Sequence, residues 1–293
     1  MKPTNTALPF FTYGSFRPGD IPFLRINSFV VKVEKTTIRG TLMCRDGLIL
    51  FADDDFDKVE GFLIYFKPSQ SDEAYDQIAM MEPKKIYRWG EKENAQKERY
   101  NILIGKAPFK GSEGIREIDG WETLSTRNDS YFTTGIAMLG EFIAATDSDA
   151  RHNGIMEPSF RLQMNYLFLW TIIERFIFFR YEFRNMARGR KQMASNKYFI
   201  EALKLRIKAE RTLHSTEDQK KYTLNRKDSV KSINYYYQVR NNLTHRGKGI
   251  NNDYMIVKDS LGELYEIFGF MLKHTINECE KQLRFYENTE QQP

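Results

Sequence analysis

The hydrophobic pattern of this 293-residue chain changes from short, strand-like runs to long, helix-like ones near residue 130. Before that point, brief apolar and β-branched runs are separated by turn residues, which is typical of β-strands. Beyond it, apolar residues recur every three or four positions, which is typical of α-helices. The chain is also longer than most single domains. We therefore expect an α+β protein of two domains, residues 1–125 and 131–293, whose boundary falls within residues 111–130.

The first domain is expected to be β-rich with one clear helix. Asp46-Gly47 between two apolar runs is a strong hairpin signal. Helical spacing predicts a helix over Asp72–Glu82, and Pro83 ends it because proline lacks the N–H that a continuing helix needs. The expected strands are Phe10–Tyr13, Phe29–Val33, Ile38–Cys44, Leu48–Phe51, Val59–Phe66, Ile86–Trp89 and Arg99–Ile104.

The second domain is expected to be all-α. Ser159 stands at the start of the second helical pattern, and Asp228 stands just before the fourth. Each is expected to cap the first turn of its helix. Gly247 and Gly249 follow the fourth pattern, as glycine commonly follows a helix C-terminus. The expected helices are Phe132–Ala145, Ser159–Tyr181, Ser195–His214, Val230–His245 and Tyr254–Tyr286.

Charge divides the chain in the same way. Residues 1–159 contain 20 Lys and Arg against 24 Asp and Glu, whereas residues 160–293 contain 24 against 15. Within residues 184–248 the excess is larger, with 17 basic side chains against 5 acidic ones. This density favours a polyanionic partner such as RNA, because Lys and Arg neutralise phosphates. The alternative is a solvated helical surface on which Lys and Arg serve solubility.

Several protein classes are excluded by cysteine and apolar content. The chain has two cysteines, Cys44 and Cys279, which lie far apart in sequence. A disulfide framework or a thiolate zinc site needs more cysteines at closer spacing. The first residues lack the apolar core of a secretory signal. Glu174 and Arg175 interrupt the most apolar stretch, residues 164–181, before it reaches the ~20 uncharged residues of a membrane span. The histidines show no metal-binding spacing. We therefore expect a cytoplasmic protein with no cofactor and no membrane partner.

A motif of the first domain carries a family resemblance. Residues 11–19 read Phe-Thr-Tyr-Gly-Ser-Phe-Arg-Pro-Gly, and they are followed by Gly40 to Gly47, by Val59-Glu60-Gly61 and by a helix that ends in Glu82. In this order the sequence resembles the γ-glutamylcyclotransferase-like family. The resemblance implies a small mixed β-barrel with flanking helices and a cavity for a γ-glutamyl or other anionic ligand. It also implies that Glu82 serves as acid and base while a γ-glutamyl amine closes to 5-oxoproline.

The residues of this motif are compatible with that chemistry. Backbone N–H groups in a glycine turn converge on one concavity and bind an anion, and Gly14 permits such a turn. A carboxyl buried in a cavity has a raised pKa, which suits proton transfer by Glu82 near neutral pH. The positive charge of Arg17 is expected to help hold an anionic ligand. The candidate ligand-binding residues are Tyr13, Gly14, Ser15, Phe16 and Arg17, with Ser15 and Phe16 as the expected N–H donors.

Three positions depart from the pattern of this family. Ala79 and Pro83 stand where members usually carry aspartate and glycine, and Phe16 stands where leucine is usual. The alternative interpretation is an ordinary strand-to-turn Tyr-Gly-Ser and a surface glutamate.

A second motif lies at the end of the fourth expected helix. Arg240-Asn241 precedes His245 by five positions, directly after three consecutive tyrosines, residues 235–237. Some of these tyrosines must lie in the core, while one is available to face a cleft. Together with the long apolar helix that carries Glu174 in its middle, the motif resembles HEPN-domain proteins. The resemblance implies an all-α helical bundle that pairs two-fold, lines one cleft with the arginine and histidine of both chains, and cuts RNA without a metal.

Each residue of this motif has an expected task. Arg240 holds the scissile phosphate, since a guanidinium binds two phosphate oxygens at once. His245 takes the 2′-OH proton or protonates the leaving oxygen, and Asn241 orients the phosphate or the histidine. Positions five apart differ by about 140° around a helix, so we expect His245 in a frayed last turn. Glu174 either pairs with Arg175 to secure its helix or helps to position the site. In the alternative interpretation, these basic residues only complement the helix dipole.

Two functions compete for this sequence, beside a third possibility in which both halves only bind, one a ligand and the other RNA. The first is a metal-independent RNA endonuclease, a homodimer of the kind found in toxin or antiviral-defence systems, whose γ-glutamylcyclotransferase-like module senses or modifies a ligand. The second is a γ-glutamyl cyclotransferase that acts through Glu82 and uses the helical half for dimerisation. The candidate catalytic residues are Arg240, Asn241, His245 and Glu82.

Overall fold

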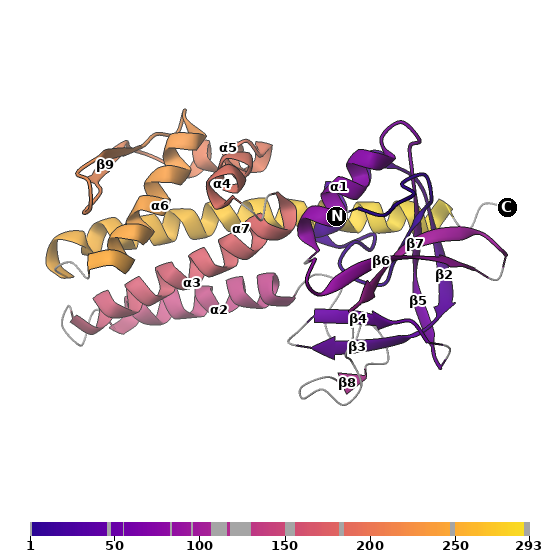
Figure 1. The fold of residues 1–293 in the computed structure, drawn as a ribbon. Helices are drawn as coiled ribbons and strands as arrows, with labels where there is room; N and C mark the ends of the chain where they lie inside the picture. The colour runs from indigo at the N-terminus through magenta and orange to yellow at the C-terminus, as the bar shows by residue number, and fades with distance from the viewer. Residues whose placement is uncertain are drawn as a thin grey trace. The chain divides into compact units, whose positions relative to one another are not determined.

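The computed structural model shows an α+β chain with seven α-helices and ten strands in its described part. It describes residues 2–45, 48–54, 56–82, 84–94, 96–106, 116–117, 130–149, 156–181, 185–246 and 250–289. The chain divides into two compact units, one formed by residues 1–129 and 276–293 and the other by residues 130–275. The first unit holds the larger sheets and the second holds most of the long helices (Figure 1).

The first unit is built on a five-stranded sheet with the order β2-β5-β1-β7-β6. The central strand β1 (Phe10–Thr12) runs antiparallel to β5 (Lys58–Phe66) and parallel to β7 (Arg99–Gly105). The outer strands are β2 (Val30–Arg39) and β6 (Tyr87–Glu93). Every residue of β1 is buried, and so is all of β7 after its first residue. Such continuous burial indicates that the middle of the sheet is covered on both faces.

The described strands do not close into a barrel, so the expected small mixed β-barrel is wrong. β2 and β6 remain the edges of the sheet, and β3 (Thr41–Arg45), β4 (Leu48–Ala52) and β8 (Arg116–Glu117) form a separate three-stranded sheet. The chain leaves the first sheet at Gly40, which has a φ of 149°. A Cβ at this position would lie 2.2 Å from the Phe51 ring, so only glycine fits the bend. Because this bend diverts β3 and β4 into a second sheet, they do not bridge β2 and β6.

Helix α1 (Ser71–Met81) is held on the large sheet by an aromatic cluster. The Tyr75 ring meets the rings of Phe10, Phe66 and Trp89 edge-on, at centroid distances of 5.3–6.3 Å. Its OH donates to the Leu8 carbonyl at 2.7 Å. These contacts fix the helix and with it the position of the residue that follows its last turn. Two short 3₁₀ helices, η1 (Ile21–Arg25) and η2 (Asn27–Phe29), precede β2.

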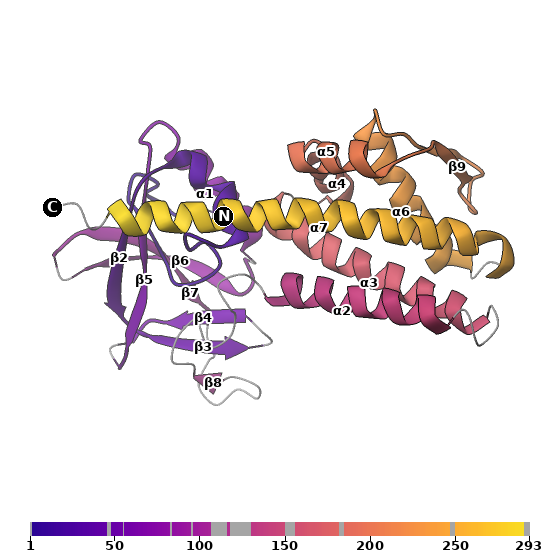
Figure 2. The same ribbon diagram turned by 180° about the vertical axis from the view of Figure 1, so that it is seen from behind.

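The last helix, α7 (Ile250–Thr289), supplies residues to both units (Figure 2). In the first unit, the Tyr286 OH donates to Asn27 Oδ1 at 3.1 Å. The Tyr286 ring also meets the Phe23 ring edge-on at 5.7 Å. The first unit is therefore completed by a segment that lies 259 positions away in sequence from its partner Asn27.

The second unit packs long helices around an apolar core. Helices α2 (Ser130–Asp149) and α3 (Met156–Arg180) lie against each other, and α3 also contacts α6 (Ser229–Arg246). Phe176 of α3 meets Phe268 of α7 edge-on at 5.4 Å, and both side chains are fully buried. None of the described helices combines the length and the apolar character that crossing a membrane requires.

The helix expected over Ser195–His214 is correct only in its first part. Helix α5 spans Lys197–Arg206, and the chain then forms β9 (Arg211–His214), which pairs antiparallel with β10 (Lys221–Leu224). Strand pairing and the burial of Leu213 override the helical spacing of the segment. The helix α4 (Met186–Ala194) was not expected.

The observed starts and caps of these helices agree only partly with those predicted from the sequence. Asp228 caps α6, because its Oδ1 accepts from the Lys231 N–H at 2.9 Å. Ser159 is not a cap, since α3 begins three residues earlier and its first turn tolerates a proline. Asn196 caps α5 by accepting from two backbone N–H groups, so this helix begins two residues after the expected Ser195. Other predicted turn residues lie outside the described residues: Asp46, Gly47, Pro83, Gly247, Gly249 and most of 111–130.

Candidate functional site

Tyr13, the first residue after β1, is anchored in the interior of the first unit. Its OH donates to the Leu103 carbonyl in β7 at 2.7 Å, and its ring lies 5.6 Å from the ring of Phe51 in β4. Burial raises the pKa of this phenol, and the charges of Tyr87 and Glu82 raise it further. The phenol is therefore neutral, and Glu82 lies close enough to influence it electrostatically.

The turn that follows presents two backbone donors. The Arg17 N–H donates to the Gly14 carbonyl at 3.2 Å and closes the turn. Within the part of the chain that the structure describes, the N–H groups of Ser15 and Phe16 have no acceptor. Ser15 is half-buried and Phe16 is buried. Two such N–H groups in one turn are suited to binding an anion.

The backbone freedom of glycine and the side chain of Arg17 have specific places in this turn. The residue with a left-handed backbone is Gly19, with a φ of 96°, so the freedom of glycine is used after the turn and not at Gly14. The Arg17 guanidinium lies over the Phe62 ring, 5.7 Å from its centre. This cation–π contact places the charge of Arg17 beside β5.

Glu82 directly follows α1 and is its C-cap. Its N–H donates to the Ile78 carbonyl at 3.2 Å, while its own backbone is extended. The residue as a whole is half-buried, but enclosure of its carboxyl raises the pKa to about 7. Loss of hydration disfavours the carboxylate and is the cause of the shift. A carboxyl with this pKa both accepts and donates protons near neutral pH.

A separate groove in the first unit was not expected from the sequence. It has a volume of about 710 Å³ and is lined by residues of β2, the loop after β6 and the end of α7. Beside it, the Tyr65 OH contacts the carboxylates of Glu34 and Glu98. Neither Glu82 nor the turn at residues 13–17 lines this groove. It is therefore distinct from the ligand site that the sequence predicts.

In the second unit, Arg240 of α6 meets charged and polar residues of two helices. Its Nη2 lies 3.9 Å from Glu174 Oε1 in α3, and its Nη1 donates to Asn241 Oδ1 at 3.4 Å. About 28% of the Arg240 side chain and 30% of the Glu174 side chain are exposed, so solvent reaches the pair. The structure thus brings Arg240, Asn241 and Glu174 together. The ion pair of Glu174 is formed with Arg240 and not with Arg175.

Arg190 of α4 joins this group, although it belongs to neither of the two sequence motifs. Its guanidinium carbon lies 3.5 Å from the centre of the Tyr237 ring, and Trp170 meets the same ring edge-on at 5.2 Å. The guanidinium carbon of Arg240 is 5.7 Å from that ring centre. We name Glu174, Arg190, Tyr237 and Arg240 the arginine cluster. It contains two positive charges and one negative charge.

Burial leaves the charge of Arg190 incompletely balanced. The residue is only 9% exposed. No carboxylate of the described residues lies within ion-pair distance of it, and its Nε has no hydrogen-bond partner. Burial lowers the pKa of Arg190. Tyr237 and Glu174 oppose this effect, whereas Arg240 lowers the pKa further.

The end of α6 differs from the expected frayed turn. The helix continues to Arg246, so the backbone of His245 is helical, and its side chain lies outside the described part of the structure. Positions 240 and 245 are therefore about 140° apart around the helix axis. One chain does not place both positions on one face of α6.

Asn242, next to the predicted Asn241, has a structural role. Its Oδ1 accepts from the Thr216 N–H at 3.2 Å, and its Nδ2 donates to the His214 carbonyl at 3.0 Å. These two bonds tie the β9–β10 hairpin to α6. Of the two asparagines, only Asn241 contacts Arg240.

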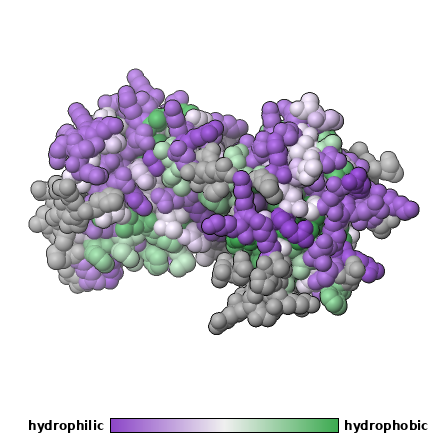
Figure 3. Space-filling model, viewed as in Figure 1, coloured by the Kyte–Doolittle hydropathy of each residue, from purple (hydrophilic) through white to green (hydrophobic). Residues whose placement is uncertain are grey.

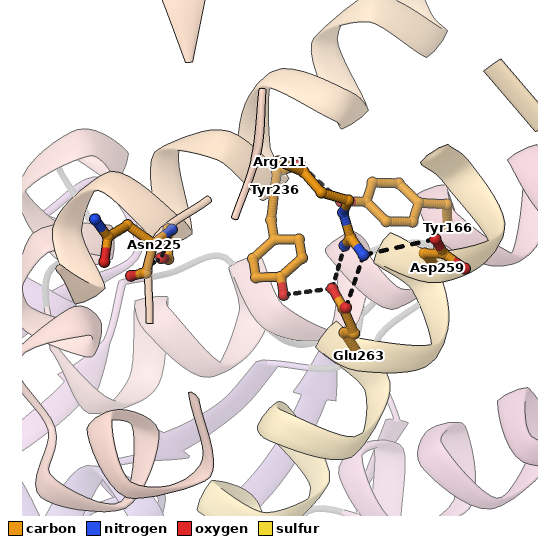
Figure 4. Close-up of polar contacts among 7 residues, drawn as sticks. Tyr166, Arg211, Asn225, Tyr236, Asp259 and Glu263 are labelled. Atoms are coloured by element: carbon orange, nitrogen blue, oxygen red, sulfur yellow. Dashed lines mark hydrogen bonds and ion pairs between the residues drawn. The ribbon is translucent and has the colours of Figure 1, made fainter. Parts of the chain in front are cut away.

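Another face of α6 is fixed by an ion pair between β9 and α7 (Figure 4). Arg211 binds both carboxylate oxygens of Glu263, and the Tyr236 OH donates to Glu263 Oε2 at 3.0 Å. Arg211 also lies 3.5 Å from Asp259. Consecutive residues differ by about 100° around a helix, so holding Tyr236 in this network also sets the direction of Tyr237.

A spacing signal for Arg190 was present in the sequence. Arg190, Met193 and Ala194 are all buried, and their spacing of three and four places them on one face of α4. The neighbouring Arg188 and Lys191 are basic and exposed. The general basic character of the segment concealed the buried arginine within it.

Metal-ligating residues do not cluster in the described parts of the chain. Among those residues, no group of three or more His, Cys, Asp or Glu side chains is arranged to hold a metal ion. His274 stacks on Tyr198 with a centroid distance of 4.2 Å, and both cysteines are buried.

Comparison with known proteins does not identify a family for this chain. No protein-family model, no curated protein and no solved structure matches it. The two family resemblances therefore depend on the residues of the two motifs.

The raised pKa of Glu82 makes the stability of the protein depend on pH. An unfolded glutamate has a pKa of about 4.3, against about 7 in the folded chain. Between these values the folded protein binds more protons, so stability falls as the pH rises. Glu82→Gln removes this loss of stability at higher pH. Relative to wild type, we expect the unfolding free energy of Glu82→Gln to rise by about 2–3 kcal/mol between pH values of about 5 and about 8.

Urea unfolding of the complete chain at the two pH values measures this difference. Glu73→Gln, at an exposed position of the same helix, is the control and should give no comparable change. A difference between wild type and Glu82→Gln that is independent of pH would contradict the assignment.

Proposed function

We propose that this chain is a metal-independent RNA endonuclease that acts as a homodimer. The observation that carries the proposal is the arginine cluster, in which two guanidinium groups and one carboxylate lie together. A phosphodiester carries one negative charge and would balance the excess positive charge of this cluster. Three of its four members, Arg190, Tyr237 and Arg240, also belong to residues 184–248, the strongly basic part of the sequence. The HEPN resemblance assigns the phosphate-binding role to Arg240, a member of the cluster.

The reaction needs no external nucleophile. The 2′ oxygen of the RNA attacks the neighbouring phosphorus, a new P–O2′ bond forms, and the P–O5′ bond breaks. His245 of one copy accepts the 2′-OH proton, and His245 of the other copy donates a proton to the leaving 5′ oxygen. Arg240 stabilises the charge that develops on the phosphate oxygens, and Asn241 orients the phosphate. The products are a 2′,3′-cyclic phosphate and a 5′-hydroxyl.

An exposed apolar surface of the second unit supports the association of two copies. Met138 and Phe142 lie four residues apart on α2, and Phe160 and Met164 lie four residues apart on α3, so each pair shares a face. These side chains and Tyr131 are 36–64% exposed. Figure 3 shows the corresponding hydrophobic surface over these helices. Apolar patches of this kind mark interaction surfaces.

The first unit would then bind a small anionic ligand and control the nuclease, as in a toxin or antiviral-defence protein. The two N–H groups of Ser15 and Phe16 and the carboxyl of Glu82 support ligand binding. The same residues favour a second candidate function, γ-glutamyl cyclotransfer. In that reaction Glu82 accepts a proton from the α-amine as its nitrogen attacks the γ-carbonyl. Glu82 then returns the proton to the leaving amine, and 5-oxoproline forms.

RNA cleavage should depend on the predicted residues and not on metal ions. We expect Arg240→Ala and His245→Ala each to lower the cleavage rate by about 100-fold or more, since each removes a group that acts in the transition state. The double variant should be little worse than the single ones, because both residues act on one phosphate in one step. Cleavage of a labelled RNA in EDTA, with analysis of the product ends, measures both effects.

Lys220→Ala is the matched control for this experiment. Lys220 is exposed and lies in the β9–β10 hairpin region, so its loss should weaken RNA binding and flatten the salt dependence without abolishing the chemistry. Two results would contradict the mechanism. One is an activity that EDTA stops and His245→Ala leaves intact, and the other is cleavage of a strand without any 2′-OH.

Light scattering of the complete chain should show a particle of twice 34.6 kDa at micromolar concentration. Phe142→Asp combined with Phe160→Asp places charges on the exposed apolar surface and should produce a monomer. Leu205→Asp is the control, because Leu205 is 68% exposed on α5 and outside that surface. A monomeric wild type, or equal disruption by Leu205→Asp, would argue against the dimer.

The cyclotransferase candidate is tested by 5-oxoproline release from γ-glutamyl dipeptides. Wild type should release 5-oxoproline, and Glu82→Gln should lower the rate by about 100-fold or more, since the acid and base is lost. Equal rates for the two proteins would eliminate this candidate. Dipeptide binding without release would support a sensing role for the first unit.

A further inference from the structure

Arg190 is an unusual side chain for the interior of a protein. It is more than nine-tenths buried, and its Nε has no hydrogen-bond partner. Among the described residues no carboxylate forms an ion pair with it. A buried charge without a counter-ion is unfavourable, because the lost hydration is not replaced. Arginine also does not escape this cost by losing its proton, since its pKa is too high.

The neighbours of Arg190 leave a net positive charge. The Tyr237 ring faces both guanidinium groups. Its centre lies 3.5 Å from the guanidinium carbon of Arg190 and 5.7 Å from that of Arg240. Glu174 is the one acidic member of the cluster. At 3.9 Å its carboxylate is beyond hydrogen-bond distance of Arg240 Nη2, so this ion pair is loose. An anion that enters the cluster can therefore replace Glu174 at Arg240 and balance the second charge.

We propose that Arg190 supplies the second positive charge of a phosphate site, in which a phosphodiester group of RNA binds at Arg240. The identity of the ligand rests on the proposed function. Arg240 is the contacting residue, because it is the more exposed of the two arginines. Arg190 is a positioning residue that acts through Tyr237 and through its charge. Glu174 pairs with Arg240 and releases it when the phosphate binds.

The site has specific requirements that an ordinary basic surface does not share. A surface lysine contributes to RNA binding through general charge, whereas the loss of Arg190 removes charge directly beside the bound phosphate. The loss of Glu174 should have the opposite effect, because it frees Arg240 and raises the local positive charge. A purely structural role for Arg190 does not predict that its loss weakens phosphate binding. It also does not predict that the loss of Glu174 strengthens phosphate binding.

Binding is measured with probes that do not depend on cleavage. One probe is a single-stranded 2′-O-methyl oligonucleotide, which lacks the 2′-OH nucleophile, with the dissociation constant taken from fluorescence anisotropy. The other is inorganic phosphate, with the shift of the unfolding temperature compared with chloride at equal ionic strength. The variants of the complete chain are Arg190→Met and Glu174→Gln. Lys191→Met is the control, because Lys191 is the exposed neighbour of Arg190 on the same helix.

Arg190→Met should weaken oligonucleotide binding by about tenfold or more and abolish the phosphate-dependent shift. Without any anion, its unfolding temperature should not fall below that of wild type, because an apolar side chain replaces an unbalanced charge. Lys191→Met should keep the phosphate-dependent shift and change oligonucleotide binding by less than about threefold. Glu174→Gln should tighten the binding of both probes.

Three results would overturn the proposal: no response of wild type to either probe, equal losses in Arg190→Met and Lys191→Met, or weaker binding by Glu174→Gln. If Arg190→Met does not fold, Glu174→Gln decides by the sign of its effect. The two proposals fail separately. Absence of RNA cleavage with the expected binding pattern refutes only the nuclease, whereas cleavage with indistinguishable Arg190→Met and Lys191→Met binding refutes only the role of Arg190.

Discussion

The ion pair between Arg211 and Glu263 holds the second unit in the arrangement on which its candidate site depends. It joins β9 to α7, and its Glu263 Oε2 accepts a hydrogen bond from the Tyr236 OH of α6. With this face of α6 fixed, and with the hairpin tied to the helix through Asn242, the next residue along, Tyr237, is directed between Trp170 and Arg190. The chemistry assigned to one face of α6 therefore depends on polar contacts made by another face.

Both candidate sites enclose an ionisable group without a compensating charge, and the two groups respond differently. Glu82 responds by a change of proton affinity, so that its pKa lies at about 7 and the carboxyl can exchange protons. Burial lowers the pKa of Arg190, but a guanidinium group in a protein does not lose its proton. We propose that an external anion balances its charge. The same physical effect, loss of hydration, thus favours proton transfer in one unit and anion binding in the other.

The sequence predicted local elements better than their association. Strand and helix spacing located β1, β5, α1, α3 and α6, and Asp228 correctly indicated the start of α6. It did not show that the chain bends out of the sheet at Gly40, because that bend depends on the Phe51 ring. Strand pairing of residues 211–214 overrode a plausible helix. The motifs pointed to Glu82 and Arg240, but Arg190 became a candidate only when packing placed it against Tyr237.

The contact between Tyr286 and Asn27 sets an order for folding during synthesis. The 259 positions between these residues take about 13 to 50 s to translate at ~5–20 residues per second. Throughout this interval the first unit lacks at least part of residues 276–293, and the Phe23 ring lacks its partner Tyr286. All of residues 130–275 have by then been translated. The helical unit is therefore complete as a chain segment before the β-rich unit that precedes it, so all residues of the arginine cluster are synthesised before the last residues of the first unit.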